Sequence, residues 1–160
     1  MLMPMNQAVF EAFRAAAIAG NAGDMQTSRG LSASEALDMS AAEFDRLAPS
    51  GLVTPGHYFF SIGADGEAEP VGYLWFAAID QDRRRIGYLY EIRVHPPFRR
   101  QGHATGALRA IEALARDLGL AELRLHAFGH NLAAQALYRK LGFEPISIVM
   151  RRALDVHSSA

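Results

Sequence analysis

A change of hydrophobic period between residues 86 and 118 constrains the fold more than any other feature of the sequence. From Ile86 to Val94 the apolar residues alternate with the two-residue period of a β-strand. Pro96 and Pro97 end that strand. From about Gly102 to Leu118 apolar residues then recur at helical spacing, at Ala104, Ala107, Leu108, Ile111, Leu114 and Leu118. A strand that leads into a helix and then into another strand predicts a parallel crossover.

The alternation in this strand predicts which side chains share a face of the sheet. One face is expected to carry Ile86, Tyr88, Tyr90, Ile92 and Val94. The opposite face is expected to carry Gly87, Leu89, Glu91 and Arg93.

The rest of the chain divides into short elements. Two helices are expected first. One spans residues 6–19 with Asn6 as its N-cap, and the other begins at the Ser32/Glu35 capping box and ends at Pro49. The residues Asn21, Gly23 and Asp24 are expected to end the first helix, and the second is carried by Leu37, Phe44 and Leu47. Strands are predicted at His57–Ile62, Val71–Ala77, Leu123–Phe128 and Phe143–Arg152, the last with alternating Ile146, Ile148 and Met150. Asn131 is expected to cap a further helix, which ends at Gly142. The dipeptide Asp65-Gly66 predicts a hairpin between the first two strands.

This order of elements predicts an α/β (α+β) fold. The first three strands pair as an antiparallel meander, the later strand–helix–strand unit adds a parallel pair, and helices cover both faces of the mixed sheet. A chain of 160 residues is expected to form a single domain over 1–160.

Composition excludes several classes of function. The chain has no cysteine, which rules out disulfides, a thiol nucleophile and cysteine metal sites. The net charge of −1 predicts no general attraction for nucleic acid or for an anionic membrane. No apolar run approaches the ~20 residues of a membrane span, and Met1 to Met5 does not resemble a signal peptide. We therefore expect a cytoplasmic protein.

The loop between the strand and the long helix carries the clearest chemical signal. Arg99 and Arg100 precede Gly102 and Ala104, where small residues open the helix. Free backbone N–H groups at a helix start bind anions, and arginines add charge-assisted hydrogen bonds. A solvated loop with two surface arginines explains the pattern equally well. The loop lacks the Gly-Lys-Ser/Thr ending of a P-loop and the three-glycine dinucleotide fingerprint.

Two segments of the chain form recognisable motifs. The first is Arg99-x-x-Gly102-x-Ala104. The second runs from Asn131 to Phe143 and fits the pattern Asn-x-x-Ala-x-x-Leu-Tyr-x-Lys-x-Gly-Phe. Both resemble the signatures of the GNAT superfamily of acetyl-CoA-dependent N-acetyltransferases, with Ala104 in place of the commoner glycine of the first signature. The family usually opens with a full strand, for which only Leu2 to Met5 is present here.

The resemblance implies acetyl-CoA as cofactor, with no metal and no covalent enzyme intermediate. In the family a β-bulge separates the strands equivalent to residues 86–94 and 123–128, and the pantetheine arm enters the gap. The cofactor-binding residues implied in this way are Ile92, Val94, Arg99, Arg100, Gln101, Gly102, His103, Ala104, Thr105, Asn131, Ala134 and Tyr138.

Three residues are implied as catalytic. The Val94 N–H would polarise the thioester carbonyl. Glu91 would act as the general base for the amine, or alternatively would pair with Arg93 or face solvent, with a water chain removing the proton. Tyr138 would protonate the departing thiolate, although a tyrosine at this helical position is more often a core residue. Asn131 has an alternative interpretation as a plain helix cap.

Other residues give weaker signals. His126 and His130 do not share a helix face and do not predict a metal site. Arg83, Arg84 and Arg85 are expected in a solvated turn. The aromatic residues Trp75, Phe76, Tyr88 and Tyr90 either line an acceptor pocket or fill the core.

The leading functional prediction is transfer of an acetyl group to a primary amine of a small molecule or peptide. A catalytically degenerate acyl-CoA-binding or interaction module of the same fold is the alternative, and a nucleotide-binding α/β protein is a third. The acceptor is not identified by the sequence. Pairing of the last strand between two chains would give a homodimer.

Overall fold

The computed structural model describes residues 1–154. A five-stranded sheet has the order β1-β2-β3-β4-β5. The elements along the chain are β1 (Leu2–Pro4), α1 (Gln7–Arg29), α2 (Ala33–Leu47), the 3-10 turn η1 (Gly51–Val53), β2 (His57–Ile62), β3 (Gly72–Gln81), β4 (Arg84–Val94), the 3-10 turn η2 (Pro96–Phe98), α3 (His103–Asp117), β5 (Leu123–Leu125) and α4 (Leu132–Lys140).

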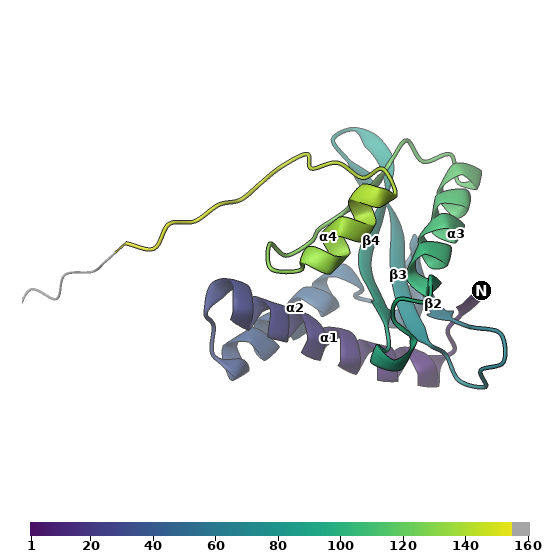
Figure 1. Cartoon of the computed structure of the whole chain (residues 1–160), viewed down its shortest axis with the longest axis horizontal. Helices are drawn as coiled ribbons and strands as arrows, with labels where there is room; N and C mark the ends of the chain where they lie inside the picture. The colour runs from purple at the N-terminus through teal and green to yellow at the C-terminus, as the bar shows by residue number, and fades with distance from the viewer. Residues whose placement is uncertain (155–160) are drawn as a thin grey trace, which may run out of the picture.

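The sheet is mixed, as the sequence predicts. The strands β1 to β4 pair antiparallel in succession, and β5 pairs parallel with β4. Figure 1 shows α3 and α4 on either side of β4, with α1 and α2 below. The three-residue β1 at the sheet edge is the short first strand that Leu2 to Met5 could supply.

Two apolar clusters occupy the two faces of the sheet. Phenylalanines of α1 and α2 pack with β2 and β3 on one face, where the buried rings are Phe10, Phe13, Phe44, Phe59, Tyr73 and Trp75. On the other face α3 packs against β3 and β4 through Ala107, Leu108, Ile111, Leu74, Phe76 and Leu89. Each ring or aliphatic side chain taken out of water in this way contributes about 1.5–3 kcal/mol.

The first helix is longer than the sequence indicates. It continues through Asn21 to Arg29 and ends at Gly30, which adopts the left-handed conformation. Tertiary packing overrides the weak helix formers, because Met25 is buried against α2 and the Asn21 amide donates to the Ser40 hydroxyl at 3.2 Å. The capping box of α2 is present, but Leu37 is 48% exposed and does not belong to its buried face.

The predicted strand Phe143–Arg152 is not formed in the single chain. Residues 144–154 have no helical or strand structure and run away from the domain as an extended segment (Figure 1). A strand exists only when a neighbour satisfies its backbone groups. Within residues 1–154 no strand pairs with this segment.

The predicted faces of β4 are correct up to Tyr90 and wrong beyond it. Trp75 pairs with Glu91 but its neighbour Phe76 pairs with Leu89, so Tyr90 is an extra residue in β4. An inserted residue reverses the alternation of side chains. Ile92 and Val94 consequently pack on the α3 side, whereas Tyr90 packs with the α1 and α2 cluster.

None of the helices among the described residues is both long and apolar enough to cross a membrane.

Candidate functional site

A cleft forms where β4 and β5 diverge. The two strands pair only from Gly87 with Leu123 to Leu89 with Leu125, after which β4 continues to Val94. The opening has a volume of about 1240 Å³, larger than the ~300–1,000 Å³ of a site for one drug-sized ligand. It can therefore accept a ligand larger than a typical drug-sized molecule. We call it the β4–β5 cleft.

The β4–β5 cleft gathers nearly all of the predicted site residues. Those lining it are Glu91, Ile92, Val94, Arg99, Arg100, Gly102, His103, Ala104, Thr105, Asn131, Ala134 and Tyr138. Gln101 is the exception and does not line the cleft. Its side-chain amide instead donates a hydrogen bond to the Pro97 carbonyl at 3.1 Å.

The bulge at Tyr90 determines how β4 faces the cleft. The His95 N–H donates to the Val71 carbonyl at 2.8 Å. Alternate residues of an antiparallel strand direct their backbone groups to the same neighbour. Glu91 and Arg93 therefore direct their backbone groups toward β3, whereas Ile92 and Val94 direct theirs toward the cleft. These two residues offer backbone groups to a ligand lying along β4.

Glu91 occupies an electrostatically unusual position in this cleft. Its side chain is 18% exposed, and its nearest cation is the Arg93 Nε at 3.6 Å. Burial is the main cause that raises the pKa of Glu91 to about 7; the charge of Arg93 opposes it, and the charge of Asp24 acts in the same direction as burial. A carboxyl group with a pKa near neutrality can exchange a proton with a ligand at physiological pH.

Tyr138 lies on the opposite wall, on α4. Burial raises the pKa of its hydroxyl to about 12, and the nearby charge of Glu91 acts in the same direction. The phenol therefore keeps its proton throughout the physiological range. Its ring packs edge-on against Phe143 with centroids 5.8 Å apart.

The start of α3 has the geometry of an anion site. Gly102 precedes the helix with φ of 88°, and no side chain caps the first turn. Arg100 is also left-handed, with φ of 64°. Uncapped N–H groups at a helix start, preceded by left-handed residues, form a concave anion-binding site. The Arg99 Nε holds this loop to the strand by donating to the Val94 carbonyl at 3.0 Å.

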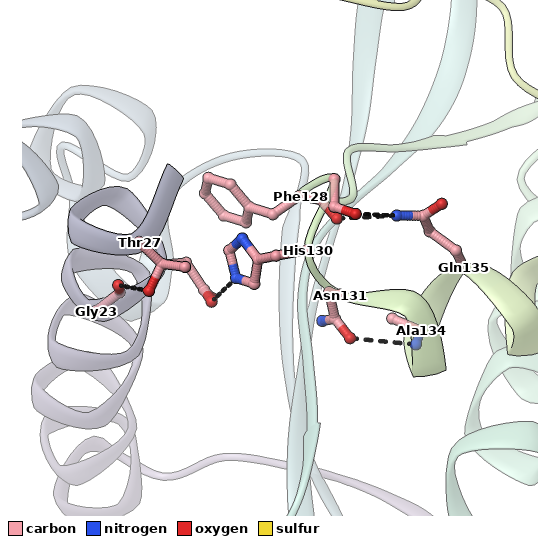
Figure 2. Close-up of polar contacts among 9 residues, drawn as sticks. Gly23, Thr27, Phe128, His130, Asn131, Ala134 and Gln135 are labelled. Carbon is pink, nitrogen blue, oxygen red and sulfur yellow. Dashed lines mark hydrogen bonds and ion pairs between the residues drawn. The ribbon is translucent and has the colours of Figure 1, made fainter. Parts of the chain in front are cut away.

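Asn131 serves as a helix cap in this structure. Its side-chain oxygen accepts from the Ala134 N–H at 3.2 Å, and the Gln135 amide ties the start of α4 to the Phe128 carbonyl at 3.0 Å (Figure 2). The loop before α4 is thereby fixed at the mouth of the cleft.

The sequence gives no indication of a contact that joins this loop to α1. The His130 Nε2 lies 2.9 Å from the Asp24 carboxylate, and the imidazole stacks on Phe128 at 5.6 Å (Figure 2). Asp24 lines the cleft as well. Because the two residues are 106 positions apart, no local spacing in the sequence indicates this contact, and the sequence pattern predicts Asp24 only as a residue that ends the first helix.

The wall formed by β3 and β4 is aromatic. Trp75, Tyr88 and Tyr90 line the cleft, whereas Phe76 is completely buried in the core. The Trp75 Nε1 donates to the His57 Nδ1 at 2.9 Å, which fixes the indole. Tyr88 and Tyr90 lie in the middle of β4, whereas the start of α3 follows the C-terminal end of that strand.

The arginine-rich turn between β3 and β4 lies outside the cleft, whereas His126 lines it. Arg83 occupies the β3–β4 turn with positive φ. Among residues 1–154, no three histidine, aspartate or glutamate side chains are arranged to hold a metal ion.

Comparisons with known proteins agree with this architecture. The sequence profile of the acetyltransferase (GNAT) family matches residues 28–143. YdgE of Bacillus subtilis (strain 168), described as an uncharacterized N-acetyltransferase, is 33% identical over 153 residues, or 96% of this chain and 97% of YdgE. The crystal structure of YycN from Bacillus subtilis has a TM-score of 0.89 at 31% identity and covers 98% of this chain and 99% of YycN.

The chain therefore belongs to the acetyltransferase (GNAT) family. The structure of AAC(6')-Iy shares the fold, with a TM-score of 0.61 at 20% identity over 98% of each chain.

Proposed function

We propose that this protein transfers an acetyl group from acetyl-CoA to a primary amine by direct attack, without a covalent enzyme intermediate. The observation that carries the proposal is the arrangement of the β4–β5 cleft. A carboxyl group with a pKa of about 7 and a protonated phenol lie close enough to interact electrostatically, and an anion site lies beside them. Both family membership and this geometry support acyl transfer.

The residues at one end of the cleft fit coenzyme A. The uncapped start of α3 at Gly102, with Arg100 beside it, suits a pyrophosphate. The cleft-facing backbone groups of Ile92 and Val94 suit an extended pantetheine arm that bonds as an added strand would. The related fold of AAC(6')-Iy was solved with a bisubstrate analogue that contains CoA. Acetyl-CoA supplies the acetyl group as a thioester.

Glu91 is the proposed general base. An alkylamine with a pKa near 10.4 is neutral in only about one molecule in 2,500 at pH 7. The Glu91 carboxylate accepts the proton that the ammonium group must lose, directly or through water. Its raised pKa matches this task, because a base that titrates near the working pH combines ionisation with useful proton affinity.

Val94 and Tyr138 are proposed to act on the thioester. The Val94 N–H points into the cleft and donates to the carbonyl oxygen as it gains charge, a contact worth about 10²–10³ in rate. The Tyr138 hydroxyl gives its proton to the departing thiolate. Since the pKa of Glu91 is about 7 and that of Tyr138 about 12, the carboxyl group is ionised and the hydroxyl still carries its proton between about pH 7 and pH 12.

The acceptor half of the cleft fits a small molecule or a peptide end that carries an amine. Trp75, Tyr88 and Tyr90 provide an apolar floor, and Asp24 adds a carboxylate near Glu91. AAC(6')-Iy was solved with an acetylated neamine analogue, and we propose a small-molecule amine of unspecified identity. The cytoplasm remains the predicted location.

The test is release of free thiol from acetyl-CoA with a panel of amines. Diamines, amino sugars, amino acids and peptide N-termini would each be offered to the wild type, to Glu91→Gln and to the exposed-site control Glu67→Gln. Turnover with at least one amine, reduced about 10²–10⁴-fold in Glu91→Gln alone, supports the proposal. Tight acetyl-CoA binding without turnover over the whole panel would favour a binding module instead.

A further inference from the structure

A glycine in the interior of α1 is the starting point. Gly20 lies well inside this helix, in a stretch that is rich in alanine. Glycine weakens a helix interior relative to alanine, because it has more backbone freedom to lose on folding. The position therefore favours alanine unless a neighbouring group requires the space that a side chain would fill.

The Arg93 guanidinium occupies that space. A Cβ atom at Gly20 would lie 2.7 Å from the Arg93 Cζ and 2.9 Å from its Nη1, and closer still to its Nη2. Ordinary van der Waals contact begins at 3.4 Å. We call the space beside this glycine the Gly20 notch. It admits the guanidinium because α1 carries no side chain at that point.

The register of β4 directs Arg93 into the notch. Glu91 and Arg93 stand opposite Trp75 and Tyr73 of β3, which are buried in the cluster formed with α1 and α2. Opposite residues of an antiparallel pair share a face of the sheet, so both charged side chains of β4 lie toward α1. The Arg93 Nε is 3.6 Å from the Glu91 carboxylate. The guanidinium is thus held between the helix and this carboxylate.

We propose that Gly20 is a positioning residue of the β4–β5 cleft: its missing side chain makes room for the Arg93 guanidinium and so holds this cation beside Glu91. The inference rests on the proposed role of Glu91 as general base. A guanidinium displaced from the notch moves toward solvent, because α1 closes one side and the Arg93 side chain is already 35% exposed. Its distance from the carboxylate then increases, and it stabilises the ionised form less.

The remaining groups near Glu91 are fixed in place or neutral. The titratable or charged groups that face it are Arg93 of its own strand, Asp24 of α1, Tyr73 of β3 and Tyr138 of α4. Asp24 is held by the His130 Nε2 at 2.9 Å. Both tyrosines have a pKa of about 12 and are neutral near pH 7. A change in the pKa of Glu91 therefore reports on the position of Arg93.

The test is the pKa of Glu91 in the full chain, followed by NMR of carboxyl-¹³C-labelled glutamate and assigned from the signal that Glu91→Gln lacks. Gly20→Ala is expected to raise this pKa by about 0.5–1 unit. The matched control is Gly23→Ala in the same helix, where an added Cβ meets no neighbouring atom of residues 1–154 within 4 Å. It is expected to leave the pKa unchanged. Circular dichroism and the fluorescence of Trp75 would establish that each variant is folded.

An Arg93→Ala background separates displacement of Arg93 from any other effect of the new methyl group, because it empties the notch. There Gly20→Ala is expected to leave the pKa of Glu91 at the value for Arg93→Ala alone. It is also expected to raise Tm as much as Gly23→Ala does, since both replacements restrict the unfolded chain equally. With Arg93 present, Gly20→Ala is expected to raise Tm less than Gly23→Ala does.

The titration needs no turnover, so this proposal and acyl transfer can fail separately. A raised pKa of Glu91 in Gly20→Ala, in a protein that acetylates no amine, would support the role of Gly20 and count against acyl transfer. Turnover with an unchanged or lowered pKa in Gly20→Ala would overturn the role of Gly20 alone. An equal rise of the pKa on addition of Gly20→Ala to Arg93→Ala would overturn it as well.

Discussion

Replacement of Glu91 by glutamine should stabilise the fold at high pH while it weakens catalysis. The pKa of Glu91 rises from 4.5 to about 7, mainly because of burial. The stability contributed by the protonated carboxyl is therefore fully present below pH 4.5 and is lost as the pH rises through about 7. At about 1.4 kcal/mol per pKa unit, the rise in the pKa from 4.5 to about 7 makes the cost of ionisation about 3.5 kcal/mol, and solvent contact of the partly exposed carboxyl reduces it to about 2 kcal/mol.

The free energy of unfolding of wild type and Glu91→Gln would be measured by urea denaturation at pH 4.5 and pH 8. Trp75, the single tryptophan, lies 4.7 Å from Tyr90 between ring centroids and reports on this region. The free energy of unfolding of the variant should exceed that of the wild type by about 2 kcal/mol at pH 8 and by almost nothing at pH 4.5. Glu67→Gln, at an exposed site, should differ by no more than about 0.5 kcal/mol at either pH. A Glu91→Gln protein that is no more stable than the wild type at pH 8 would refute the reasoning.

Three further substitutions test the remaining parts of the cleft. Tyr138→Phe should lower kcat about 10²-fold and leave acetyl-CoA affinity unchanged; an unchanged kcat with chemistry rate-limiting would exclude the acid role. Arg93→Met should move the acid limb of the pH profile of kcat/KM to higher pH, because the charge of Arg93 lowers the pKa of Glu91; a shift to lower pH would contradict the assignment of Glu91. Gly102→Ala should weaken acetyl-CoA binding in titration calorimetry by up to about tenfold, because a non-glycine residue costs ~1–2 kcal/mol in the left-handed conformation. Gly106→Ala, within the same helix, should bind acetyl-CoA with the affinity of the wild type. Equal losses of affinity in both variants would contradict a specific role of the start of α3 in binding.

The features of the fold that depend on a few adjacent residues could be predicted from the sequence. The Ser32 capping box and the Asn131 cap are each predicted from a few adjacent residues. The anion loop was predicted for the same reason, since strand end, arginines and small residues lie within one short segment. The mixed topology followed from the order of the elements.

What the sequence did not predict depends on contacts between distant residues. The resemblance implied a bulge in the strand at residues 86–94, but its position at Tyr90 is defined by the register against Trp75 and Phe76, and alternation within β4 alone cannot show it. The contact of Asp24 with His130 joins helix α1 to a loop far along the chain. The strand at Phe143–Arg152 was predicted from its own alternation, but a strand requires a neighbour, and residues 1–154 do not provide one.

Titration calorimetry with acetyl-CoA tests the central claim most directly. The account predicts saturable binding at micromolar concentrations with one acetyl-CoA for each chain, and no comparable heat with ATP or NAD. Absence of acetyl-CoA binding, or tighter binding of either nucleotide, would contradict the assignment of the β4–β5 cleft as an acetyl-CoA site.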